Sequence, residues 1–68
     1  MRHSAFAARL GIHPRTIRRQ FQRGGLPGAV EHGERILLIP AHLVRLAETY
    51  GLRGVERLAL AGLISATG

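Results

Sequence analysis

The sequence predicts a small, mainly helical domain with one β-hairpin. Apolar residues recur at helical spacing in several stretches, and glycines or prolines separate those stretches. Between them, the segment "AVEHGERILLI" changes to the pattern of two short paired strands. With 68 residues and no cysteine, the chain is expected to form one domain that depends on a small apolar core.

Each of the first two predicted helices has a start signal and a stop signal. Ser4 is the expected cap of a helix through "AFAARL", which Gly11 ends. Pro14 opens a second helix that runs to about residue 23, where Gly24 and Gly25 stop it. The inward-facing residues are predicted to be Phe6, Leu10, Ile17 and Phe21.

The second half of the chain predicts the hairpin and two further helices. Strands at 29–30 and 35–39 flank the turn "EHGE", and alternation buries one face of "ILLI" while exposing the other. Pro40 opens a third helix that Gly51 closes, and "GVERLALAGLI" is the last helix. The inward stripe of the third helix is Leu43, Leu46 and Ala47.

Positive charge is concentrated in the first third of the chain. All ten Lys or Arg residues are Arg, all four Asp or Glu residues are Glu, and the net charge is +6. Residues 1–23 contain six of these arginines and no acid, whereas residues 24–68 contain four arginines and four glutamates. This asymmetry favours a polyanionic partner, with nucleic acid ahead of an anionic membrane surface. The alternative is a solvated basic face.

The first two predicted helices have the pattern of a helix-turn-helix. Ala7 is small where the second helix must pack closely, Gly11 supplies the turn, and Ile17 anchors the second helix. The alternative is an ordinary helical pair with solvated arginines. The shared core of the two helices is predicted to be Phe6, Leu10 and Ile12.

The same geometry leaves a basic stripe on the outer face of the second helix. In a major groove, Arg reads guanine and Gln reads adenine. The predicted base-contacting residues are Arg15, Arg18, Arg19 and Gln22. The predicted contacts to the DNA backbone are Arg9, Thr16, Arg23 and Arg35.

The stretch "AARLGIHPRTIRRQFQRGGLP" resembles the N-terminal element of MerR-type regulators and of small phage or mobile-element excisionases. The resemblance continues through "GERILLIPAHLVRL" and covers roughly residues 3–50. It implies a winged helix-turn-helix DNA-binding domain at 1–52, with "EHGE" as the tip of the wing. His32 then joins Arg35 as a cationic contact from the wing to the DNA backbone.

Three positions depart from that group. His13 replaces the usual Ser or Thr before the proline, so weaker capping is expected. Gln20 replaces a frequent aromatic, so a phosphate or packing contact is expected to be lost. Glu31 and Glu34 lie at the wing, where basic residues are frequent, which weakens the expected contact between wing and phosphate.

The chain has neither the long dimerisation helix nor the effector domain of MerR regulators. The favoured function is therefore that of an excisionase-like factor, which binds double-stranded DNA sequence-specifically and shapes it for a recombinase. A minimal MerR-like transcription regulator, acting with RNA polymerase, is the alternative. The alternative from another class is an adaptor that docks through its apolar C-terminal helix.

The last segment, 53–68, is expected to be either a lid on the core or a self-association element. Self-association would give a homodimer or a cooperative oligomer on DNA. The predicted self-association residues are Val55, Leu58 and Leu63.

Other functional classes lack their required residues. The hydroxyl residues have no evident base partner and there is no Asp, so no enzyme activity is predicted. Without cysteine or closely spaced histidines, neither a metal site nor a cofactor is expected. No apolar run approaches the roughly 20 residues of a membrane span, and no signal peptide is recognised. A cytoplasmic, nucleoid-associated protein without a membrane partner is the expectation.

Overall fold

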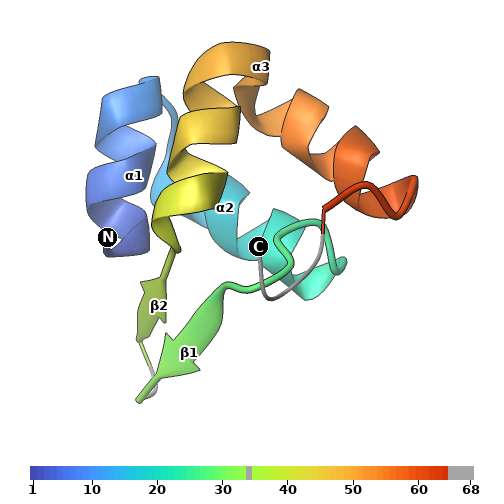
Figure 1. Cartoon of the computed structure of the whole chain (residues 1–68). Coiled ribbons are helices and arrows are strands. Elements are labelled where there is room, and N and C mark those ends of the chain that lie inside the picture. Colours follow the sequence, from blue (N-terminus) through green and yellow to red (C-terminus); the bar gives the residue numbers. More distant parts are fainter. Residues whose placement is uncertain (34, 65–68) are drawn as a thin grey trace.

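The computed structural model describes residues 1–33 and 35–64. This part of the chain is mostly helical, with three helices and one antiparallel hairpin (Figure 1). The coarse prediction of a mainly helical domain with a small hairpin is therefore confirmed. In chain order the elements are α1 (His3–Leu10), α2 (Pro14–Gln22), β1 (Val30–His32), β2 (Ile36–Leu38) and α3 (Ala41–Leu60).

A glycine turn joins α1 to α2, as predicted. Gly11 adopts a left-handed conformation with φ 70° and ψ 31°, and its N–H donates to the carbonyls of Ala7 and Ala8. The N–H of Ile12 also donates to the Ala7 carbonyl, at 3.0 Å. These bonds satisfy carbonyls that the end of α1 would otherwise leave unpaired. The short turn brings Ile17 of α2 into the same core cluster as Phe6 and Ala7 of α1.

The start of α1 differs from the prediction. The helix begins at His3 and the cap position is Arg2, without a side-chain cap, so the assignment of Ser4 as cap is wrong. The preceding residues instead run beside β2. The Met1 ammonium donates to the Ile39 carbonyl at 3.0 Å, the Ile39 N–H donates back to Met1 at 2.7 Å, and Arg2 forms a bridge with Leu38.

The strands differ from the prediction: β1 extends into the predicted turn, and β2 is shorter than predicted. β1 pairs with β2 in the register Val30↔Leu38, Glu31↔Leu37 and His32↔Ile36, so Glu31 lies in a strand rather than in the turn. Gly33 has φ 79°, which suits its expected place in the turn. Glu34, the other predicted acid of the tip, and residues 65–68 of the predicted C-terminal segment lie outside the described residues.

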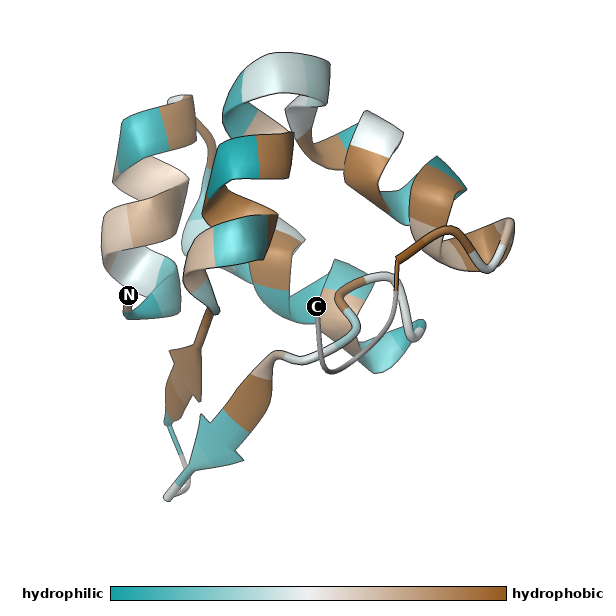
Figure 2. Ribbon diagram, viewed as in Figure 1, coloured by the Kyte–Doolittle hydropathy of each residue, from teal (hydrophilic) through white to brown (hydrophobic). Residues whose placement is uncertain are grey.

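The predicted alternation of the second strand is confirmed. Leu37 and Ile39 are buried, whereas Leu38 and its partner Val30 are exposed. Figure 2 shows that β2 is hydrophobic along its whole length, so its exposed face is apolar as well.

Gly51 divides α3 into two helical halves. Its φ of 78° and ψ of 168° are not helical, and the helix bends there (Figure 1). The helical residues are 41–50 and 52–60, in agreement with two helices separated by Gly51. The second half ends at Leu60, before the predicted end at residue 64. Gly62 has φ 73°, and the Leu63 N–H donates back to the Leu58 carbonyl at 2.9 Å.

The core gathers residues from every helix and from the β2 end of the hairpin. α1 packs against α2, α3 and β2. The buried apolar residues are Phe6, Ala7, Ile17, Leu26, Leu37, Ile39, Leu43, Val44, Ala47 and Val55. Leu10, Ile12, Phe21 and Leu46 pack partly buried against them, so the inward residues predicted for the first three helices take their expected places.

Candidate nucleic-acid interface

One face of α2 is buried and the opposite face is polar and basic. Ile17 and Gln20 are buried, whereas Arg15, Arg19 and Gln22 are exposed. The exposed residues are spaced by four and three, which places them along one side of the helix. The nine residues of α2 include three arginines and no acid. This face therefore presents long cationic and amide side chains from a helix that is fixed from behind.

His13 caps the N-terminus of α2. Its Nδ1 accepts a hydrogen bond from the N–H of Arg15 at 3.0 Å, and Pro14 occupies the first turn, where no N–H is needed. The imidazole thus supplies the acceptor that Ser or Thr would otherwise supply, so α2 keeps a side-chain cap at this position.

Arg18 lies apart from the other predicted base-contacting residues. Its Nη2 donates to the Arg35 carbonyl at 3.1 Å, and its Nη1 lies 4.0 Å from Oε2 of Glu31. The side chain is 28% exposed. The structure thus places Arg18 between α2 and the hairpin, where it links the two, while Arg15 and Arg19 extend into solvent.

Two predicted DNA-backbone contacts form ion pairs with glutamates of α3. Arg9 Nη1 lies 3.1 Å from Oε1 of Glu48, and both side chains are about half exposed. Arg23 donates a hydrogen bond from Nε to Oε2 of Glu56 at 3.0 Å, and its Nη2 lies 2.9 Å from the same oxygen. The sequence analysis missed both pairs, because each joins residues more than thirty positions apart.

The remaining predicted backbone contacts are exposed. Thr16 lies on α2, His32 ends β1, and Arg35 precedes β2. Of the two hairpin residues, Arg35 lies beside α2, because its carbonyl accepts a hydrogen bond from Arg18.

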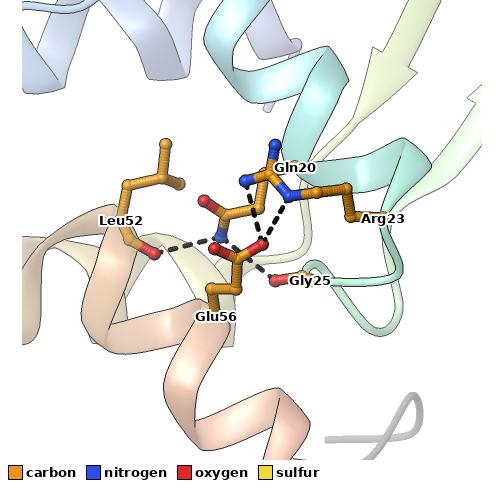
Figure 3. Close-up of polar contacts among 5 residues, drawn as sticks. All are labelled: Gln20, Arg23, Gly25, Leu52 and Glu56. Carbon is orange, nitrogen blue, oxygen red and sulfur yellow. Dashed lines mark hydrogen bonds and ion pairs between the residues drawn. The ribbon is translucent and has the colours of Figure 1, made fainter.

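Gln20 is a structural residue that the sequence analysis missed. It is the one buried polar side chain among the residues that the structure describes, with 2% of its surface exposed. Its Nε2 donates to the carbonyls of Gly25 at 3.1 Å and Leu52 at 3.0 Å (Figure 3). The expected loss of a packing contact is therefore wrong. The signal was its spacing of three from Ile17, which puts both side chains on the inward face.

Gly25 gives this cluster its close packing. A Cβ at that position would lie 2.7 Å from Cγ of Gln20 and 2.9 Å from Oε2 of Glu56. Gly25 is buried and Glu56 is only 23% exposed in its side chain. Figure 3 shows the amide of Gln20 and the carboxylate of Glu56 meeting beside Gly25, between the end of α2 and the second half of α3.

The predicted self-association residues fall into two groups. Val55 is fully buried in the core of the single chain, so its assignment to self-association is wrong. Leu58 is partly buried, while Leu63 is exposed together with Leu60.

Two negative findings apply to residues 1–33 and 35–64. No group of three His, Cys, Asp or Glu side chains is placed to hold a metal ion. No helix in that part of the chain combines the length and the hydropathy that crossing a membrane requires.

Comparison of the chain with protein-family models, with curated proteins and with solved structures found no match.

Proposed function

We propose that this chain is a winged helix-turn-helix protein that binds double-stranded DNA by inserting α2 into the major groove, with the hairpin as the wing. The observation that carries the proposal is the exposed, acid-free face of α2 formed by Arg15, Arg19 and Gln22. A B-form major groove is about 12 Å wide and admits one α-helix. Guanidinium and amide groups are the side chains that pair with guanine and adenine edges there.

The contacts that hold α2 in place favour sequence-specific recognition of bases over non-specific electrostatic binding. Base recognition needs side chains that extend from a rigid element. Ile17 anchors α2 in the core, His13 caps its start, and Gln20 fixes its end to α3. Arg15 and Arg19 therefore project from a helix that is held at both ends.

Within this class, we favour an excisionase-like architectural role in recombination, with a minimal MerR-like transcription regulator as the alternative. Both rest on the resemblance of the sequence from the first helix through the hairpin. Finding an integrase gene beside the gene for this chain would favour the excisionase-like role. Finding a divergent promoter there would favour the transcription regulator.

Exposed apolar residues at the end of α3 and just after it favour assembly of more than one copy on DNA. Leu60 is 76% exposed and Leu63 is 73% exposed. Small modules bury limited DNA surface, so adjacent copies raise affinity. An adaptor function, in which the same residues dock another protein, is the candidate from a different class.

The proposal is tested by fluorescence anisotropy with duplex DNA at increasing salt. If about five phosphates are neutralised, log K falls against log salt with a slope near −4 to −5. Single-stranded DNA of the same length and anionic vesicles serve as competitors. Preference for the duplex supports the proposal, whereas equal or stronger binding to either competitor contradicts it.

A further inference from the structure

Glutamates of α3 pair with one arginine of α1 and with the arginine at the C-terminal end of α2, whereas the arginines on the outer face of α2 have no such partner among the described residues. Glu48 pairs with Arg9 and Glu56 pairs with Arg23. Among residues 1–33 and 35–64, no carboxylate forms an ion pair with Arg15 or Arg19. We propose that Glu56 is an internal counter-ion that withholds Arg23 from DNA phosphates and so lowers sequence-independent binding. This inference rests on the proposed DNA-binding function.

The geometry of the pair makes Glu56 an effective competitor of phosphate. One carboxylate oxygen accepts a hydrogen bond from Nε of Arg23 at 3.0 Å and lies 2.9 Å from Nη2 of the same guanidinium. Charge-assisted hydrogen bonds are stronger than neutral ones, and a phosphate oxygen competes for the same guanidinium donors. A DNA backbone must therefore displace this carboxylate to use that edge of Arg23.

Burial of the carboxylate makes this displacement unfavourable. The Glu56 side chain is 23% exposed, whereas that of Arg23 is 57% exposed. The carboxylate also packs beside Gly25, where even a Cβ would lie 2.9 Å from it. If Arg23 turned to a phosphate, the partly buried Glu56 carboxylate would lose its counter-ion. Breaking this ion pair therefore costs more free energy than breaking an exposed one.

The Arg9–Glu48 pair provides a matched control within the same chain. Its side chains are 52% and 48% exposed, so solvent already screens it. Losing Glu48 removes the same charge as losing Glu56 but releases an arginine that was weakly held. The two glutamine variants therefore separate a loss of negative charge from the release of a firmly held cation.

The experiment measures binding of a random-sequence duplex between about 50 and 200 mM salt. Glu56→Gln is expected to bind roughly threefold to tenfold more tightly at the low-salt end, with a salt slope steeper by about 0.9, the value for one more phosphate. Glu48→Gln is expected to change both quantities less. In an Arg23→Gln background, Glu56→Gln is expected to change neither.

Three results would overturn the inference: an unchanged slope in Glu56→Gln, an equal gain in Glu48→Gln, or a gain that persists in the Arg23→Gln background. If the wild type does not bind duplex DNA at all, the proposed function itself fails. If the wild type binds duplex DNA and Glu56→Gln binds it with the same affinity and salt slope, only the role of Glu56 is overturned.

A second readout covers the case in which Arg23→Gln does not fold. The NMR signal of the Arg23 Nε–H is followed in the wild type and in Glu56→Gln as random duplex is added. A larger DNA-induced shift in Glu56→Gln supports withholding of Arg23, and an equal or smaller shift contradicts it.

Discussion

The side-chain amide of Gln20 joins α2 to the second half of α3, with its Nε2 3.0 Å from the Leu52 carbonyl. The same nitrogen donates to the Gly25 carbonyl at 3.1 Å. One buried amide thus connects the end of the proposed recognition helix, the turn after it and the residue that follows the Gly51 break (Figure 3).

Replacing this amide is expected to destabilise the fold. Gln20→Leu keeps the size of the side chain but leaves two carbonyls without their donor, which costs about 1–3 kcal/mol of unfolding free energy. The matched control is Gln22→Leu on the exposed face of α2, with an expected change below about 0.5 kcal/mol. Urea unfolding followed by circular dichroism measures both variants. Equal effects would show that the Gln20 bonds add nothing.

Helix ends and inward-facing positions could be predicted from the sequence, whereas the hydrogen-bond partners of the buried Gln20 could not. Helix ends at Gly11 and Gly24 and the break at Gly51 follow from local backbone chemistry, so the pattern located them. The inward position of residue 20 also follows from helical spacing. Its partners do not, because the Leu52 carbonyl is 32 positions away and depends on how α3 folds back.

The same limit applies to the candidate interface. The exposed positions of Arg15, Arg19 and Gln22 follow from a single helix and were predictable. The partners of Arg9 and Arg23 lie on α3, at sequence distances that no local pattern encodes. The start of α1 was misplaced for the same reason, since the residues before it pair with the distant strand β2.

Removal of the His13 cap is expected to weaken α2. His13→Ala should lower the unfolding free energy by about 0.5–2 kcal/mol, because the Arg15 N–H loses its acceptor. His13→Asn should retain most of the stability, since asparagine is a favoured cap. Chemical unfolding of the three proteins checks this. Asparagine as destabilising as alanine would contradict capping as the role of His13.

Val55 and Leu63 were both predicted to mediate self-association, but Val55 is buried and Leu63 is exposed. Their alanine variants are therefore expected to affect different properties. Val55→Ala should destabilise the single chain by about 2 kcal/mol, because it leaves a cavity in the core. Leu63→Ala should change stability by less than about 0.5 kcal/mol and reduce assembly on DNA. Thermal unfolding and sedimentation on long duplexes measure the two effects. Unchanged assembly in Leu63→Ala would remove this residue from the proposed contact between copies.

The most direct test compares Arg19→Ala with Arg45→Ala, which removes the same charge from an exposed position on α3. A duplex selected by the wild-type protein from a random library and an unselected duplex serve as ligands. Arg19→Ala is expected to cost about 1–3 kcal/mol on the selected duplex and far less on the unselected one, with little discrimination lost in Arg45→Ala. Equal losses for Arg19→Ala on both duplexes would contradict base readout by α2.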